Sequence, residues 1–374
     1  DGNGAQLERS ELWFENDLQP DSKPWLPEID APRLLESLTS SVADRLMSDV
    51  PLGIVLSGGL DSALVAALAH DASERTGYPV PACWTVAESE DNPDWIAAER
   101  VCKTLDLEHH QHLLEEDAFT NSLPNLAWHG EDLDLTVLFF QPLFAKMSES
   151  VSVGLCGQGA DELHAGYPRY RNLSAHRDVI ESRLRASEHP FATHLLGTDI
   201  NLDGWRGAHQ PNQVFSELQT TLDYEINHGQ LTNFQLRLVD RHSMAHGLEV
   251  RVPFLGNSHF AAASRLPLEW KLSPQVEKIG LREAAKLTRL PTDIIQRPKL
   301  PAGRATSPTM IDKLLTELKG HAIEYANDIP SISGMFQNQP EIALGLRLFR
   351  SLHIVDRGVG RHGKDLMTLL EDVN

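Results

Sequence analysis

The sequence predicts an α/β fold, in which a parallel twisted sheet carries helices on both faces and a mostly helical C-terminal part follows. Up to Cys156, apolar runs of strand length alternate with segments of helical apolar spacing, as expected for βαβ units. A glycine-rich turn also stands between one strand and the next helix at residues 57–62. Because ligands bind at the carboxyl ends of parallel strands, the loops after Leu56, Val86 and Cys156 are expected to meet at one site.

Turn residues and apolar periodicity predict where the individual helices and strands begin and end. The first helix is expected to begin near Pro32, capped by Asp30, and to bury a stripe that recurs every four residues. The expected strands are Leu52–Leu56, Pro81–Ala87, His109–Leu114 and Val151–Cys156. The further expected helices are Ala63–Arg75, Pro93–Leu107, Thr136–Ser150 with a break near Pro142, Phe215–Val239 and Lys278–Thr288. We expect three parts: an N-terminal extension or linker (1–30), an α/β core that carries the glycine-rich turn (31–255) and a helical part that completes the site (256–374).

The segment LGIVLSGGLDS, residues 52–62, carries the main chemical signal. A strand, a glycine turn and a helix in this order place backbone N–H groups at a helix N-terminus, where they suit phosphate. The loop lacks the lysine of a Walker A loop. Asp61 follows the glycines instead, and a carboxylate beside bound phosphates is a natural Mg²⁺ ligand. An ordinary glycine turn is the alternative.

Two later segments add polar groups to the same expected edge of the sheet. Cys156-Gly-Gln-Gly-Ala-Asp-Glu162 has two glycines that permit close backbone approach, and Asp161 could face Asp61 as a second Mg²⁺ ligand. Acidic residues at a helix N-terminus would explain Asp161 equally well. Arg297-Pro298-Lys299 follows much later, and Lys299 alone would be interpreted as a surface lysine.

Four segments in order resemble the synthetase domain of the glutamine-dependent asparagine synthetase family. They are SGGLDS (57–62), CGQGADELHAGYPRY (156–170), DRHSMAHGLEVRVPFL (240–255) and RPK (297–299). The first also resembles the SGGxDS loop of N-type ATP pyrophosphatases. The resemblance implies an adenine nucleotide alpha hydrolase-like (PP-loop) fold with ATP and Mg²⁺. A carboxylate, aspartate in that family, would be adenylated with release of pyrophosphate, and ammonia or another amine would then displace AMP.

The resemblance also implies roles for individual residues. Asp61 and Asp161 match Mg²⁺ ligands, and Lys299, Gln158 and Asp161 are the implied catalytic residues. The implied nucleotide-binding residues are Leu56, Ser57, Gly58, Gly59, Asp61, Ser62, Val86, Cys156 and Gly157. Lys299 would meet charge that develops on the α-phosphate.

Three departures from the family pattern keep a second hypothesis open. Gln158 stands where the family has a glutamate, and a glutamine can orient a nucleophile but is no general base. Gly256 replaces the aspartate of VPFLD, and the residues before Leu34 hold no glutaminase domain or cysteine nucleophile. The chain is therefore either an amide ligase, supplied with a free amine or by a separate glutaminase subunit, or a catalytically silent nucleotide-binding relative with a regulatory role. A ligase for another acid and amine is also open.

Composition excludes several other classes. The net charge of −20, with 10 Lys against 23 Arg, argues against a nucleic-acid partner and indicates either a protein that works in concentrated salt or an ordinary acidic enzyme. No apolar run has the length of a membrane span, and the three cysteines lack metal or disulfide spacing, so we predict a cytoplasmic protein.

A Cys156 nucleophile is disfavoured because Gln158 occupies the position of the second elbow glycine. His109, His110 and His112 are interpreted as a solvated strand edge rather than a metal site.

Overall fold

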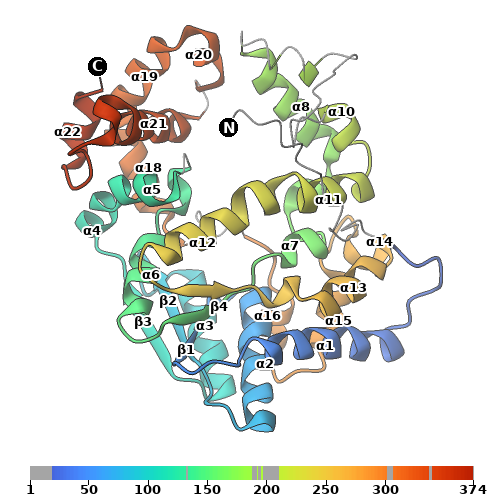
Figure 1. Ribbon diagram of the computed structural model, residues 1–374. Coiled ribbons are helices and arrows are strands. Elements are labelled where there is room, and N and C mark those ends of the chain that lie inside the picture. The colour runs from blue at the N-terminus through green and yellow to red at the C-terminus, as the bar shows by residue number, and fades with distance from the viewer. Residues whose placement is uncertain are drawn as a thin grey trace, which may run out of the picture.

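A computed structural model describes residues 19–131, 134–187, 192, 195–196, 210–300, 306–336 and 339–373. Within these residues, five strands form one all-parallel sheet in the order β3-β2-β1-β4-β5 (Figure 1). The strands are β1 (Leu52–Val55), β2 (Ala82–Ala87), β3 (His109–Leu113), β4 (Val153–Leu155) and β5 (Glu249–Arg251). The predicted α/β fold with a parallel sheet is confirmed, and it matches the adenine nucleotide alpha hydrolase-like fold.

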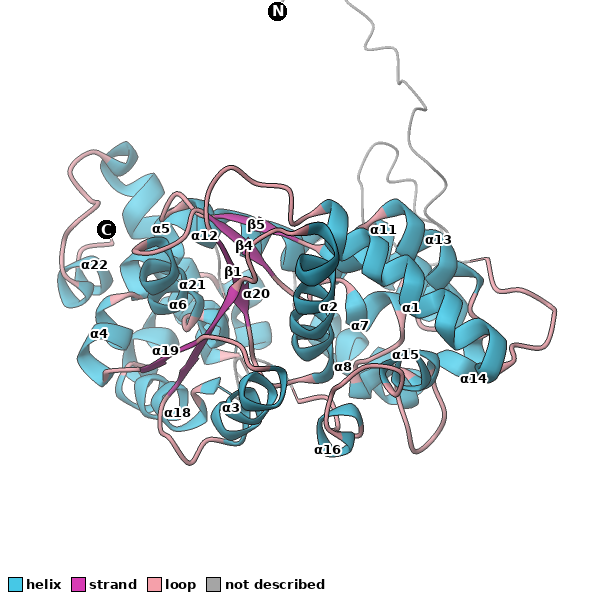
Figure 2. Ribbon diagram, turned by 90° about the horizontal axis from the view of Figure 1, so that it is seen from below, coloured by secondary structure: helices cyan, strands magenta, loops and turns pink. Residues whose placement is uncertain are grey.

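Helices cover both faces of the sheet because side chains alternate along its strands. On one face, Ile54 and Cys83 pack with the helices α2 (Leu60–Thr76) and α3 (Pro93–Leu105). On the other, Trp84 packs with α6 (Phe140–Ser148) and α12 (Leu236–Met244). Figure 2 shows the sheet between α2 and α3 on one side and α6 on the other.

Helices from the last third of the chain complete two separate cores. One set packs around α4 (Glu116–Asn121) and α5 (Leu123–Gly130), on the side of the sheet that holds α6 (Figure 1). This set is α18 (Pro308–Glu317), α19 (Lys319–Asp328), α20 (Pro330–Phe336), α21 (Pro340–Phe349) and α22 (Leu366–Glu371). The other set packs against α1 (Pro27–Asp44) and α2. It includes α13 (Asn257–Arg265), α15 (Ile279–Ala285) and α16 (Thr292–Ile295).

The remaining helices follow β4 or lie between α13 and α15. They are α7 (Ala160–Leu163), α8 (Leu173–Arg185), α10 (Pro211–Val214), α11 (Leu218–Asn227) and α14 (Leu268–Lys271). Of these, α7 is the one that follows β4 directly and places the second predicted loop beside α2.

The structure corrects three predicted helices. The helix expected near Pro32 begins at Pro27, because proline suits the first helical turn, and Asp30 lies within that turn, where it accepts the N–H of Leu26. The segment 136–150 divides before Phe140 into a 3₁₀ turn (Leu135–Val137) and α6, so the break does not lie at Pro142. The segment 215–239 divides into α11, a π-helical turn η3 (Leu231–Gln235) and α12.

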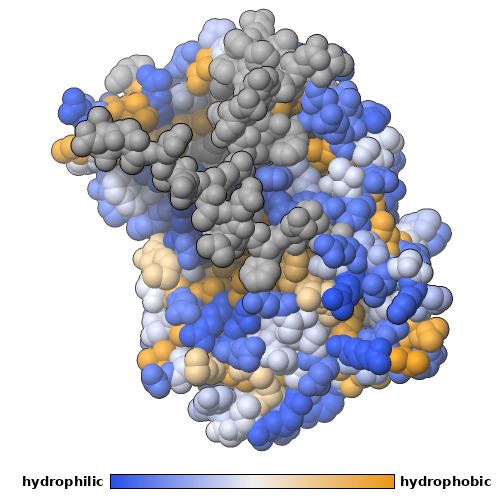
Figure 3. Space-filling view, turned by 45° about the vertical axis from the view of Figure 1, so that its right-hand side comes forward, coloured by the Kyte–Doolittle hydropathy of each residue, from blue (hydrophilic) through white to orange (hydrophobic). Residues whose placement is uncertain are grey.

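The strands agree with prediction to within two residues at each end, but β5 was not predicted. It is three residues long and lies at the sheet edge beside β4, so its sequence has no detectable period. None of the described helices is long and apolar enough to cross a membrane. On the face in Figure 3, hydrophilic side chains predominate and hydrophobic ones gather only in small patches.

Candidate active site

The SGGLDS loop forms a tight turn between β1 and α2 that is tied together by its own hydroxyl groups. The Ser57 N–H donates to Ser62 Oγ over 3.1 Å, and Ser62 Oγ donates to the Gly59 carbonyl over 3.2 Å. Gly58 has a φ of +68°, and a Cβ atom there would lie 2.6 Å from the Asp94 carbonyl. Only glycine therefore allows the turn to lie against α3. The first turn of α2 has no side-chain cap, which leaves its N–H groups available to a phosphate.

The second loop, residues 156–159, lies directly on the first. A Cβ atom on Gly157 would lie 2.9 Å from the Cβ of Asp61, so the missing side chain permits this approach. Gly159, with a φ of +90°, turns the chain into α7, whose second residue is Asp161. The two aspartates thus stand at the starts of the helices that follow two neighbouring parallel strands, β1 and β4, and the two loops meet as the sequence predicted.

One buried lysine that the sequence analysis did not single out joins the two carboxylates. Lys278 Nζ lies 2.6 Å from both carboxylate oxygens of Asp61 and 2.6 Å from Asp161 Oδ1. Its side chain is only 2% exposed. Lys299 Nζ lies 2.7 Å from Asp161 Oδ2 and 3.9 Å from Asp61 Oδ2. The site therefore contains two carboxylates and two ammonium groups in mutual contact.

These contacts decide the charge state of the site. Burial alone would raise the pKa of Asp161, but the charges of Lys278 and Lys299 outweigh it and hold that pKa well below its ordinary value. Burial alone would lower the pKa of Lys299, but Asp161 and Asp61 hold it well above its ordinary value. Both groups are therefore charged at neutral pH. Burial, together with the charge of Asp161, raises the pKa of the neighbouring Glu162 to about 7.

A second layer of ion pairs holds the lysines in place. Glu277 Oε1 accepts the backbone N–H of Lys299 over 3.1 Å and pairs with Arg282 Nη2 at 2.5 Å. Arg297 pairs with Asp94 at 2.6 Å beside the first loop. A cavity of about 40 Å³ remains between Ser57, Gly59, Asp61, Lys278, Arg297 and Lys299. Hydroxyl, ammonium and guanidinium groups line this cavity, and such groups bind phosphate oxygens.

The other predicted site residues lie around this centre in different ways. Leu56 and Cys156 directly follow the adjacent strands β1 and β4 and are buried, in the cores on opposite faces of the sheet. Burial raises the pKa of the Cys156 thiol to about 11, which agrees with its rejection as a nucleophile. Val86 lines a cavity of about 840 Å³ with Trp95, Phe119, Gln141 and His246, and Lys299 is not among the residues that line it. Gln158 lies in the second loop, and its Nε2 donates to Gln235 Oε1 over 3.0 Å.

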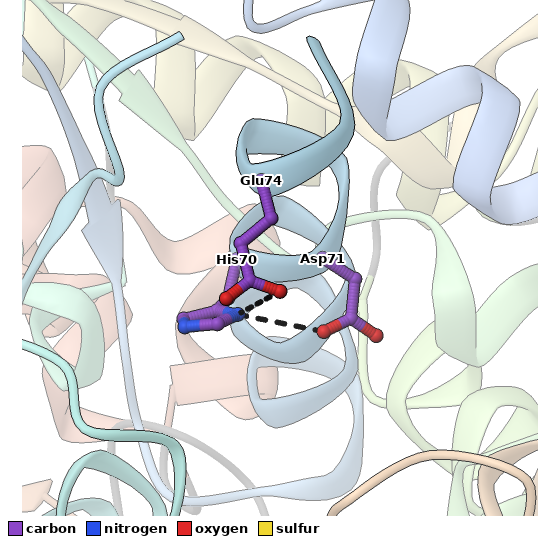
Figure 4. A group of neighbouring side chains, drawn as sticks. All are labelled: His70, Asp71 and Glu74. Carbon is purple, nitrogen blue, oxygen red and sulfur yellow. Dashed lines mark ion pairs between the residues drawn. The ribbon is translucent and has the colours of Figure 1, made fainter. Parts of the chain in front are cut away.

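Two other clusters of possible metal ligands have simpler explanations. On β3, His109 contacts Thr85 Oγ1 and His110 stacks on Trp84, as expected for a partly exposed strand edge. On α2, His70, Asp71 and Glu74 point toward one another, with ligand atoms within 4.8 Å (Figure 4). Arg289 Nη2 lies 2.5 Å from His70 Nδ1 and 3.0 Å from Asp71 Oδ1. The guanidinium therefore already serves as the cation of this cluster.

The donor set between the two loops fits Mg²⁺. Asp61 and Asp161 direct carboxylate oxygens to one point, where Lys278 now supplies the positive charge, and oxygen ligands of this kind are those that Mg²⁺ prefers. A Mg²⁺ ion at this point would be held by Asp61 and Asp161 together with substrate phosphates. Lys278 has no signal in the sequence because its partner Asp61 lies 217 positions away.

Fold and site together define an α/β protein of the adenine nucleotide alpha hydrolase-like fold, with its glycine-rich loop between β1 and α2. The family model for asparagine synthase matches residues 33–339, and the chain belongs to this family. Asparagine synthetases (glutamine-hydrolyzing) of Cricetulus griseus and Homo sapiens are each 28% identical over 269 residues, covering 70% of this chain and 40% of their own length. A protein of Mycobacterium bovis is 29% identical over 313 residues, covering 70% of this chain and 46% of its own. The chain thus spans less than half the length of these relatives.

Proposed function

We propose that the chain is an ATP-dependent amide ligase, which activates a carboxylate by adenylation and transfers the acyl group to ammonia or another amine. The observation that carries this proposal is the meeting of Asp61, Asp161, Lys278 and Lys299 beside an uncapped helix N-terminus. A module that only binds nucleotide needs the phosphate loop. It does not need two carboxylates and two lysines held in contact by a second layer of ion pairs.

The reaction has two steps. A carboxylate oxygen of the acid attacks the α-phosphorus of ATP, and the bond to the bridging oxygen breaks, so that the electron pair leaves with pyrophosphate. The amine nitrogen then attacks the acyl carbon, the bond to the AMP oxygen breaks, and the nitrogen loses a proton to water. Mg²⁺ would supply positive charge beside the phosphates in the first step.

The residues of this chain would bind and neutralise charge. Backbone N–H groups at the start of α2 would hold the leaving pyrophosphate. Lys278 and Lys299 are tied to the aspartates, and binding of Mg²⁺ at those carboxylates would release both ammonium groups toward the phosphate oxygens. Lys299 is the more exposed of the two, at 23%, so it is the better placed to reach the α-phosphate.

Residue 256 bears on which acid is activated. Aspartate follows from the family, but Gly256 replaces the family aspartate, and a Cβ atom there would lie 1.9 Å from Ser41 Oγ of α1. The space for a side chain at this position is filled, which favours testing other carboxylates beside aspartate. The amine would be ammonia or a small primary amine, supplied free or by a separate glutaminase subunit.

A second candidate function is a catalytically silent nucleotide-binding relative. Gln158 favours it, because the amide cannot accept a proton from the amine as a carboxylate would. The two candidates differ in the products made from ATP, since only a ligase forms AMP and pyrophosphate in the presence of an acid and an amine.

Product analysis with Mg²⁺, ATP, ammonium chloride and a panel of carboxylic acids tests the proposal. We expect AMP and pyrophosphate in equal amounts with at least one acid. Asp61→Asn should lose both product formation and Mg·ATP binding. Asp71→Asn, on the same helix but outside the site, should keep both. Tight Mg·ATP binding without product from any acid would support the silent relative instead.

A further inference from the structure

A chain of four side chains leads from Gln158 into the interior of the protein. Gln158 Nε2 donates to Gln235 Oε1 over 3.0 Å, and Gln235 Nε2 donates to the Tyr167 hydroxyl over 3.4 Å. The Tyr167 hydroxyl donates in turn to Glu162 Oε1 over 2.9 Å. Glu162 is fully buried. The four residues come from the second loop, η3, the segment after α7, and α7 itself.

The direction of these hydrogen bonds follows from the contact between Tyr167 and Glu162, at the buried end of the series. The Tyr167 hydroxyl donates to Glu162 Oε1, so its single hydrogen is used there. The hydroxyl oxygen must then accept from Gln235, which has to present its amino group. Gln235 therefore turns its carbonyl oxygen toward Gln158, which must present its own amino group. The carbonyl oxygen of Gln158 is left for the active site, and it has no partner among the described residues.

The backbone supports this arrangement. Gln235 ends a π-helical turn, and such turns commonly mark functional sites because they displace one side chain from the helical repeat. Lys299 Nζ lies 5.9 Å from the centre of the Tyr167 ring, so this series of hydrogen-bonded side chains passes beside the reacting groups. Glu162 Oε2 is buried and has no hydrogen-bond partner in the described part of the molecule, and Tyr167 donates to the other oxygen of this carboxyl group.

We propose that Glu162, Tyr167 and Gln235 are positioning residues that fix the Gln158 carbonyl oxygen toward the amine substrate. An N–H of ammonia or a primary amine would donate to this oxygen, which leaves the nitrogen lone pair directed at the acyl carbon. The opposite orientation would present the Gln158 amino group, which would engage that lone pair and block attack. Gln158 takes no proton, because the proton lost by the nitrogen goes to water. This inference rests on the proposed ligase function and assigns its amine subsite.

One test needs no substrate, because the direction of these hydrogen bonds determines how the stability of a Gln158 variant depends on pH. In Gln158→Glu, the introduced carboxyl would face Gln235 Oε1 and could pair with it only when protonated. Its folded-state pKa would be raised above the ordinary value of about 4.3. The variant should then be progressively destabilised relative to wild type as pH rises from about 4.3 through that raised pKa.

Adding Tyr167→Phe to Gln158→Glu should remove this pH-dependent loss, because Gln235 is then free to rotate and present its amino group. The loss caused by Gln158→Glu is measured once against wild type and once against Tyr167→Phe alone, so that the charges of Asp61, Asp161, Lys278, Lys299 and Glu162 are present on both sides of each comparison. Tyr170→Phe removes a nearby hydroxyl that is outside the chain and is the matched control, which should leave the loss unchanged. A pH-independent effect of Gln158→Glu, or a loss that persists with Tyr167→Phe, would overturn the proposed direction.

The second test separates the two half-reactions with an acid that supports activity in wild type. Tyr167→Phe should leave acid-dependent exchange of pyrophosphate into ATP within about twofold of wild type, but should raise KM for ammonium chloride by roughly tenfold, as loss of one hydrogen bond would. Tyr170→Phe should change neither. An equal fall in both half-reactions would mean a purely structural role for Tyr167. If wild type shows no exchange with any acid, the proposed function fails, and the stability test still decides the direction of the chain.

Discussion

Lys278 and Asp61 form a bidentate ion pair, with Nζ 2.6 Å from each carboxylate oxygen, across 217 positions of sequence. The same ammonium group contacts Asp161. Two buried carboxylates in one site repel each other unless a cation lies between them. In this structure Lys278 fills that role, and the proposed function requires Mg²⁺ to take over part of it.

Lys278→Met should therefore destabilise the protein, and Mg²⁺ should reverse part of the loss. Removing one partner of a buried ion pair costs about 3–5 kcal/mol, because the other charges are left buried. Urea unfolding with and without Mg²⁺ measures both effects. Lys286→Met removes an exposed pair with Glu283 and is the matched control, which should cost about 1 kcal/mol or less. If Mg²⁺ does not reduce the loss of stability in Lys278→Met, then the Lys278 ammonium group and Mg²⁺ do not share one position.

Lys299→Ala should lower turnover far more than it weakens ATP binding. An interaction made mainly in the transition state appears in kcat, and loss of one such electrostatic partner costs roughly a hundredfold or more. Steady-state kinetics and calorimetric titration with Mg·ATP separate the two quantities. Weaker ATP binding with unchanged turnover would show that Lys299 binds only ground-state phosphate.

Gly166→Ala should disrupt the site, although Gly166 is not one of the groups that react. An added Cβ would lie 2.0 Å from Asp161 Oδ1 and 2.2 Å from Lys278 Cε, so both side chains must move. We expect Mg·ATP affinity to fall by at least about tenfold, which corresponds to about 1.4 kcal/mol. Gly320→Ala, in α19, adds a Cβ in open space and should stabilise by about 0.5–1 kcal/mol without changing affinity. Wild-type affinity in Gly166→Ala would mean that the contact between Asp161 and Lys278 is dispensable.

Lys271 should make stability depend on pH in the alkaline range. Its Nζ is fully buried and donates to the carbonyls of Leu163 and Ala263, and burial lowers its pKa to about 7. The unfolded chain binds the proton up to a pH of about 10.4. Between these values the unfolded state holds more protons, so stability should rise with pH, by at most about 1.4 kcal/mol per unit. Lys271→Met should remove this slope in urea unfolding between pH 7.5 and 9.5. An unchanged slope would show that Lys271 stays charged.

The parts of the site that could be predicted are those whose geometry is local. The order strand, glycine turn and helix places Ser57, Gly58 and Asp61 without knowledge of any other segment. Asp161 follows in the same way from β4 and two glycines. The sheet orders these loops, because parallel strands present their carboxyl ends at one edge.

The parts that could not be predicted depend on contacts between distant segments. Lys278 stands before an ordinary amphipathic helix, and nothing nearby indicates that its side chain crosses to α2. Gln235 lies in a stretch whose apolar period predicted one continuous helix, and the π-helical turn that displaces it has no signal in that period. The edge strand β5 is set by pairing with β4 rather than by its own three residues.

Exchange of radiolabelled pyrophosphate into ATP tests the central claim most directly, since it reports adenylation without any amine. The measurement uses wild type, Lys299→Ala and Lys286→Ala with Mg²⁺ and each acid of the panel. The account predicts exchange that depends on one acid and on Mg²⁺, that is lost in Lys299→Ala, and that is kept in Lys286→Ala. Absence of acid-dependent exchange in wild type that binds Mg·ATP, or equal exchange in Lys299→Ala, would contradict it.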